Sequence, residues 1–280
     1  MEQNNKSDLA LDPKIQKYYE MGEEDDRLAQ LYGKLEKQRT SVLLERYLES
    51  PPKRIIDVGG GSGPYACWLA EKGYYVELLD PMPLHLEQAK KASALPTRGK
   101  IASFTVADAR KLNSPDSSFD YVLLFGPLYH LTERSDRIKA LTEANRVLKS
   151  GGQVFAVGIS RLTSTLDALF HGGIDDPEFK KIIKRDLVDG QHRNECQNQD
   201  YFTTSFFHKP EILKNEIEES GFVCEKLFAI EGPGWLLQNF TDIWNDKVKQ
   251  AELLEAIRWL EEEESILEIS AHIMAVARKL

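Results

Sequence analysis

The sequence predicts an α/β fold in three layers, in which helices cover both faces of a mostly parallel sheet. From Pro52 onward, short apolar runs of strand length alternate with segments of helix length, and repeated units of this size form such a sheet. The first apolar run also leads directly into glycines that open a helix. The 280 residues, 41% hydrophobic and 29% charged, suffice for one large domain or one domain plus a cap.

Residues 1–52 are expected to form a helical cap before the sheet. From about Pro13 to Leu48 the apolar residues recur at helical spacing, which indicates two or three helices. Pro51 and Pro52 close this section, because proline cannot continue a helix.

Residues 53–159 are expected to form the core. The first strand is a short apolar run that ends in glycines, and Gly73 ends the helix that follows it as a C-cap. The turn Asn113–Ser118 introduces the fourth strand, and Ser150–Gly152 leads from a long amphipathic helix into the fifth. The expected strands cover 54–58, 74–79, 101–106, 120–125 and 153–159, and the expected helices cover 63–72, 82–93 and 132–148.

Two segments interrupt this alternation late in the chain. Residues 160–209 are rich in Gly, His, Asn, Asp and Lys and are expected to form a lid, because insertions of this kind lie over the carboxyl ends of strands, where ligands bind. Its stretch Tyr201–His208 mixes aromatic and hydroxyl side chains, which is typical either of a lid over an amphipathic substrate or of a hairpin packed on the core. Residues 210–280 complete the sheet with a helix at 210–220, strands at 222–230 and 272–278, and a helical insertion at 235–264.

The bulk chemistry excludes several classes of function. A net charge of -9 opposes nucleic-acid binding, since a duplex-binding protein needs a cationic face. The three cysteines form no metal-binding spacing, so no metal is expected. No apolar run is long enough to cross a bilayer, and no signal peptide is evident. We therefore expect a cytoplasmic protein, monomer or homodimer, with a small-molecule substrate. His171 and His192 are interpreted as solvated loop residues, and the run Glu261–Glu264 as a solvated helix face.

The glycine loop at residues 57–63 is the strongest functional signal. Gly59 permits the tight turn after the strand, Gly61 lets a ligand lie against the backbone, and Gly63 lets the helix approach the strand. A dinucleotide-binding loop follows the pattern GxGxxG. Pro64 stands where its third glycine is required, so that pattern fails.

Acidic residues stand at three neighbouring strand ends. Asp57 lies beside the loop, where it would repel a pyrophosphate and fits a ligand with a cationic centre and an ammonium group. Asp80 ends the second strand about twenty residues later, the position from which a carboxylate accepts ribose hydroxyls. Asp108 ends the third strand and can accept from an adenine amino group. Taken singly, each acid is also typical of a turn or a helix N-cap. Together they predict a nucleoside pocket without a phosphate anchor.

At these positions the chain resembles the class I S-adenosylmethionine-dependent methyltransferases. Asp57–Gly63 resembles their first motif and Asp80 their ribose-binding acid. The other matching segments are Val106–Ala109, Ser118–Tyr121 with Leu123–Phe125, and Ala144–Gly152. The resemblance implies a Rossmann-like fold whose seven-stranded sheet has an antiparallel last strand. It also implies S-adenosylmethionine as cofactor and transfer of its methyl group to a nucleophile.

By position, the resemblance implies a set of cofactor-binding residues. They are Gly59, Gly61 and Phe125 near the methionine part, Asp80 and Pro81 at the ribose, Asp108 and Ala109 at the adenine, and Asp57 and Gly63 in the loop. The motif Asn-Pro-Pro-Tyr of nucleobase methylation is absent after the fourth strand, where Gly126–Leu131 stands instead. The absence of that motif argues against DNA methylation. The segment Gly126–Leu131 that stands in its place resembles that of a group of bacterial small-molecule methyltransferases.

Candidate catalytic residues lie near the expected methyl position. Tyr129 and His130 follow the fourth strand, and His208 lies in the expected lid; a histidine there can act as a general base. A packed aromatic and a helix cap are the alternatives for the first two. In the cap, Tyr19 is expected to close over the cofactor and Arg39 to pair with its carboxylate. Helix packing and a surface ion pair are the alternatives there.

The sequence thus predicts methyl transfer to an O, N or C atom of a small organic acceptor. Three alternatives stay open at this point. They are RNA or protein methylation, a cofactor-binding regulator without turnover, and a nicotinamide oxidoreductase, which the missing third glycine opposes.

Overall fold

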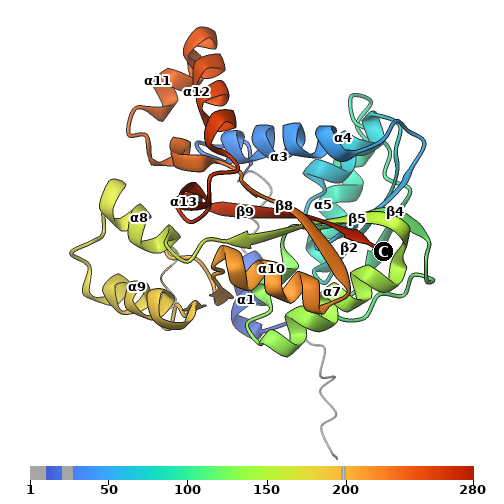
Figure 1. The fold of residues 1–280 in the computed structure, drawn as a ribbon, viewed down its shortest axis with the longest axis horizontal. Helices are drawn as coiled ribbons and strands as arrows, with labels where there is room; N and C mark the ends of the chain where they lie inside the picture. Colours follow the sequence, from blue (N-terminus) through green and yellow to red (C-terminus); the bar gives the residue numbers. More distant parts are fainter. Residues whose placement is uncertain (1–10, 21–27, 197, 199) are drawn as a thin grey trace, which may run out of the picture.

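A seven-stranded sheet runs through the centre of the molecule (Figure 1). The computed structural model describes residues 11–20, 28–196, 198 and 200–280. The strand order is β3-β2-β1-β4-β5-β9-β8, and β9 alone runs antiparallel to its neighbours in this sheet. The strands are β1 (Arg54–Val58), β2 (Tyr75–Asp80), β3 (Ser103–Val106), β4 (Phe119–Leu124), β5 (Leu148–Ile159), β8 (Phe222–Ala229) and β9 (His272–Lys279). The expected fold, including the antiparallel last strand, is confirmed.

Helices cover both faces of this sheet, and each face has its own apolar cluster. On one face Leu43 of α3, Leu69 of α4 and Leu86 of α5 pack against the strands; on the other, Leu141 of α7 and Leu213 of α10 do so. All five side chains are buried. Because helices cover β1 and β4 on both faces, these two strands are nearly continuous apolar runs. These helices are α3 (Gly33–Tyr47), α4 (Pro64–Glu71), α5 (Pro83–Ser93), α7 (Arg134–Val147) and α10 (Pro210–Glu219).

The other helices lie mainly in the cap and the two insertions. The cap contributes α1 (Pro13–Glu20), and α6 (Pro127–His130) follows β4 directly. The first insertion holds α8 (Thr163–Phe170), α9 (Pro177–Asp189) and a hairpin of β6 (Gln191–His192) and β7 (Ser205–Phe206). The second holds the 3-10 helix η1 (Gly232–Leu236), α11 (Phe240–Asn245), α12 (Lys247–Leu260) and α13 (Glu264–Leu267). Both insertions follow the carboxyl end of a strand, β5 or β8, so they reach the edge of the sheet where ligands bind.

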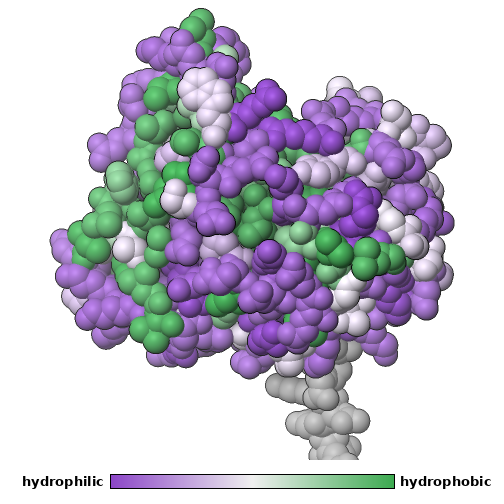
Figure 2. All heavy atoms as spheres, in the orientation of Figure 1, coloured by the Kyte–Doolittle hydropathy of each residue, from purple (hydrophilic) through white to green (hydrophobic). Residues whose placement is uncertain are grey.

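The insertions expose apolar side chains and extend from one side of the sheet. α8 and α9 lie at the lower left of Figure 1, and green surface gathers there in Figure 2. Leu169 and Phe170 of α8 and Val188 of α9 are among the exposed residues. Within the described part of the chain, none of the helices combines the length and apolar character needed to span a bilayer.

Two expectations about single elements require correction. The turn expected at 150–152 lies inside β5, which begins at Leu148. The run Glu261–Glu264 is not a uniformly solvated face, because Glu261 is buried and accepts hydrogen bonds from Arg39 and Arg46. A buried carboxylate needs such partners, since an unpaired charge in the interior is strongly unfavourable.

Candidate active site

The loop between β1 and α4 forms the floor of a cavity at the carboxyl ends of the strands. The cavity and its mouth hold about 1230 Å³ of empty space, part of it open to solvent. A Cβ atom added to Gly61 would meet no heavy atom within 4 Å, so its backbone faces this open space. Gly63 has a φ of +79°, and a Cβ there would lie 3.0 Å from Leu78 and 3.2 Å from Ala89. Gly63 therefore serves the close packing of α4 and does not line the cavity, whereas Gly61 leaves room for a ligand.

Asp57 presents an unsatisfied carboxylate to the cavity. Its side chain is 1% exposed, and its Oδ2 has no hydrogen-bond partner. Burial, with a smaller contribution from the charge of Asp80, raises the pKa of Asp57 to about 7. A buried acceptor without a donor is unfavourable. A cationic ligand group would satisfy it, so the observed environment fits the ammonium-bearing ligand that the sequence predicts.

Asp80 holds the glycine loop and the start of α5 together. Its Oδ2 accepts from the backbone N–H of Gly61 at 2.9 Å, and its Oδ1 accepts from the N–H of Met82 at 2.8 Å. His85 Nδ1 donates to the same Oδ1 at 2.9 Å. A carboxylate oxygen accepts two hydrogen bonds. Oδ2 therefore keeps capacity for one more donor, such as a ribose hydroxyl, and Pro81 lines the cavity next to it.

Asp108 and Ala109 both line the cavity where β3 ends. Both carboxylate oxygens of Asp108 already accept from Arg110: Oδ1 from Nε at 2.9 Å and Oδ2 from a terminal nitrogen at 2.7 Å. Asp136 accepts from the same guanidinium at 2.7 Å. This arrangement fixes the loop after β3. An adenine amino group that donated to Asp108 would therefore share its carboxylate with Arg110.

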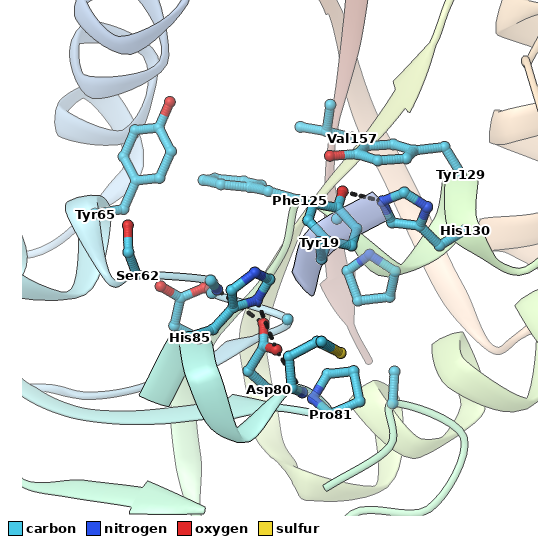
Figure 3. A pocket seen from close by; sticks show the side chains of 18 of the residues that line it. Tyr19, Ser62, Tyr65, Asp80, Pro81, His85, Phe125, Tyr129, His130 and Val157 are labelled. Carbon is cyan, nitrogen blue, oxygen red and sulfur yellow. Dashed lines mark hydrogen bonds and ion pairs between the residues drawn. The ribbon is translucent and has the colours of Figure 1, made fainter. Parts of the chain in front are cut away.

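Aromatic side chains lie on two sides of the cavity. Figure 3 shows Tyr65 and Ser62 on one side of the cavity and Tyr129 and His130 on the other. The hydroxyl of Tyr19, on α1, lies 2.6 Å from Nε2 of His130. α1 thus borders this side of the cavity, and Tyr19 is among the residues that line it.

A second cavity adjoins the first beneath the lid, and we call it the acceptor chamber. Its aromatic lining includes residues from the cap, from α6, from the lid and from η1: Tyr18, Tyr19, Tyr129, Phe179, Tyr201, Phe202, Phe207 and Trp235. Of the residues that the structure describes, Tyr19, Tyr129 and His272 line both cavities. The aromatic lid residues expected from the sequence therefore face a ligand-sized space.

Arg39 and His208 lie outside both cavities, which corrects their expected roles. Arg39 is 2% exposed; it donates to Glu261 and, at 3.1 Å, to the carbonyl of Ile230. His208 is fully buried, and its Nε2 lies 3.4 Å from Glu216, which also pairs with Arg137. Burial lowers the pKa of His208. Arg39 is held by partners 191 and 222 positions away in the sequence and His208 by one only eight positions away, and neither lines either cavity.

Several residues of the site have no strong sequence signal. Tyr65 and His85 line the first cavity from α4 and α5. His192 is not solvated as expected; it is buried and lines the acceptor chamber, with Nδ1 2.9 Å from Asp186. His272 is the first residue of β9, and its position at a strand end on the ligand-binding edge is the signal that would have found it.

The comparisons with known proteins cover this region. Residues 56–156 match a family model described as a methyltransferase domain. The ubiquinone/menaquinone biosynthesis C-methyltransferase UbiE of Rickettsia bellii is 36% identical over 186 residues, 63% of this chain and 71% of that protein. Demethylmenaquinone methyltransferase of Thermotoga maritima is 30% identical over 210 residues, 70% of this chain and 85% of that protein. A solved structure of a SAM-dependent methyltransferase from Methanosarcina mazei has a TM-score of 0.59 at 18% identity, over 85% of this chain and 97% of that one. The family match contains the glycine loop and the acids that end β2 and follow β3.

Proposed function

The chain belongs to the class I S-adenosylmethionine-dependent methyltransferases, and we propose that its acceptor is a small aromatic compound held in the acceptor chamber. When bound, S-adenosylmethionine supplies an electrophilic methyl group on a sulfonium centre. The observation that carries the proposal is the shared wall of the two cavities, because it brings a ring-lined space to the cofactor site.

We assign the cofactor to the first cavity. The unsatisfied oxygen of Asp57 fits its ammonium group, and the open space over Gly61 admits it against the backbone. Asp80 Oδ2 can accept from a ribose hydroxyl, and Ala109 borders the adenine end. Phe125 lies edge-on to Tyr65, with ring centroids 5.2 Å apart, and together they cover the methionine end.

The lining of the acceptor chamber favours a planar ring as acceptor. Aromatic pairs in edge-to-face or offset geometry contribute about 0.5–1.5 kcal/mol beyond the burial of their area. Phe202 already lies in such contact with Tyr129 and with Tyr18. The relative from Thermotoga maritima is named for a quinone, which supports a ring-bearing acceptor for this chain. A hydroquinone or phenol offers the protein both a flat face and a nucleophilic atom.

Calorimetric titration tests the cofactor site. S-adenosylhomocysteine is expected to bind the wild-type protein, and Asp80→Ala to weaken binding by about 1–3 kcal/mol, the effect of leaving polar groups unpaired. No heat and no thermal stabilisation with the wild type would refute the function itself. Unchanged affinity in the variant would remove only Asp80 from the site.

A methylation assay tests the acceptor. With 1,4-naphthohydroquinone kept reduced, mass spectrometry is expected to show gain of one CH₂ unit. Phe202→Ala is expected to raise the KM for this acceptor about tenfold without changing the affinity for S-adenosylhomocysteine. Phe170→Ala is the matched control, because Phe170 is exposed on α8 and lines neither cavity. An equal effect of both variants, or no methylation of any phenol or hydroquinone by a cofactor-binding protein, would refute the acceptor class.

A further inference from the structure

His272 lies at the junction of the cofactor cavity and the acceptor chamber. As the first residue of β9 it pairs with Ile159, the last residue of β5. Ile159 lines the acceptor chamber, and Val157, two residues earlier on the same face of β5, lines the cofactor cavity. The imidazole therefore stands where a methyl group would pass from one ligand to the other.

A buried carboxylate fixes this imidazole. Nδ1 of His272 lies 2.7 Å from Oε1 of Glu231, whose side chain is 2% exposed. The other carboxylate oxygen accepts from the Ser270 hydroxyl at 2.9 Å and from the backbone N–H of His272 at 3.0 Å. A carboxylate can only accept, so a neutral His272 carries its proton on Nδ1 and Nε2 is the basic nitrogen. Three donors hold Glu231 in place, which leaves the ring little freedom to turn.

We propose that His272 is the general base of the methyl transfer and that Glu231 is its positioning residue. The inference rests on the proposed function and narrows it to an acceptor whose nucleophile carries a proton, such as a phenolic or hydroquinone O–H. Nε2 takes the proton, and the electron pair released forms the bond to the methyl carbon. The pair of the broken sulfur–carbon bond stays on sulfur, and the proton passes from His272 to water.

The other candidate bases are less well placed. His130 lines only the cofactor cavity, and its Nε2 is engaged with the Tyr19 hydroxyl. His208 lines neither cavity. Tyr129 lines both, but a neutral phenol is a much weaker proton acceptor than a neutral imidazole. Among the described residues of the shared wall, only His272 is an imidazole with a carboxylate partner.

The charged groups around His272 are mainly acidic. Glu36 of α3 lies close to the pair: one oxygen of Glu36, one of Glu231 and one ring nitrogen of His272 are all within 4.8 Å of one another. Asp167 of α8 lines the same chamber, and Arg39 is the cation whose charge interacts with Glu231. Removing the charge of Glu231 would thus favour the neutral imidazole and shift the pH dependence of the rate to lower pH.

Replacing the ring tests the proposal directly. His272→Gln is expected to lower kcat for 1,4-naphthohydroquinone by about 10²-fold or more, to abolish the rise of the rate with pH, and to leave the Kd for S-adenosylhomocysteine unchanged. His171→Gln is the matched control, because His171 also has Nδ1 on a carboxylate, Asp167 at 2.9 Å, but lines neither cavity. If His272→Gln keeps the wild-type rate and pH profile while wild-type protein binds S-adenosylhomocysteine, the base is refuted and the proposed function stands.

Three further measurements test the pair, and the first and third use the wild-type protein, so they do not depend on the folding of a variant. Long-range ¹H–¹⁵N spectra of the wild type, in which only six histidines are to be assigned, are expected to show the Nδ1–H tautomer for neutral His272; the Nε2–H tautomer would overturn the proposal. Glu231→Gln is expected to move the acid limb of the rate profile to lower pH, and an unmoved limb would exclude its positioning role. Activity that chelators abolish and a divalent ion restores would also refute the base, since Glu36, Glu231 and His272 would then be metal ligands.

Discussion

Replacing Gly61 by alanine has two effects that can be measured separately: strain in the backbone, which lowers stability, and loss of space for the ligand, which weakens binding. Gly61 has a φ of +58°, and an added Cβ would meet no protein atom within 4 Å. The only intramolecular penalty is therefore the left-handed conformation, about 1–2 kcal/mol for a residue with a Cβ. In a protein of this size each kcal/mol lowers the melting temperature by about 2–4 °C. The same methyl would occupy space that we assign to the cofactor, and overpacking of this kind weakens an interaction by about 1–3 kcal/mol.

Gly151 provides a matched control for this substitution. Its φ is +78°, an added Cβ would again meet nothing within 4 Å, and it lies in the first half of β5, away from the cofactor cavity. We expect Gly61→Ala and Gly151→Ala to lower the melting temperature of the cofactor-free protein by similar amounts. Only Gly61→Ala should weaken binding of S-adenosylhomocysteine, by about 5- to 150-fold in calorimetry. If both variants bind as the wild type does, the cofactor does not lie against Gly61 and our placement is refuted.

Three further outcomes follow from contacts of the site and its surroundings. Arg39→Met is expected to lower the free energy of unfolding, measured in urea, by about 3 kcal/mol, because Glu261 loses a buried partner. The Kd for S-adenosylhomocysteine should stay unchanged. Weaker binding without loss of stability would show that Arg39 contacts the cofactor after all. Folded Asp57 keeps a proton up to a pKa of about 7 that an unfolded aspartate loses near 3.8, so the stability of the cofactor-free protein should fall as pH rises through this window and level off above it. Urea unfolding at several pH values checks this, and a slope that survives Asp57→Asn would contradict it. Tyr19→Phe and His130→Ala each remove one hydrogen bond, about 1 kcal/mol, and each should lower turnover about fivefold and more than it lowers cofactor affinity. The double variant should be no worse than either, so full additivity in steady-state kinetics would show that the contact plays no part.

The part of the site that the sequence predicted is local in the chain. A strand, four glycines and a helix start lie within residues 54–64, so the loop and the position of Asp57 follow from residue type and spacing alone. Asp80 follows for the same reason, since a strand end is readable from its own apolar run. Neighbouring strand ends then share an edge of the sheet as a consequence of parallel topology.

The misplaced residues depend on partners that the residue pattern around them does not reveal. Arg39 meets Glu261 across 222 positions, and the sequence shows only an arginine in a helix and an acidic run elsewhere. His208 sits in an aromatic stretch that predicts a lid, yet its packing against Glu216 turns it inward. The polar loop around His192 predicts a surface residue, but His192 is buried and its ring pairs with Asp186.

The reversal of β9 decides which segment of the chain can contribute to catalysis. Because β9 enters the sheet at the edge where β8 leaves it, both ends of the intervening segment return to the same place. Val248, near the middle of that segment, is exposed and far along the chain from either end. Trp235 near one end of the segment and His272 directly after the other both line the acceptor chamber, so the reversal of β9 brings both ends to the same cavity.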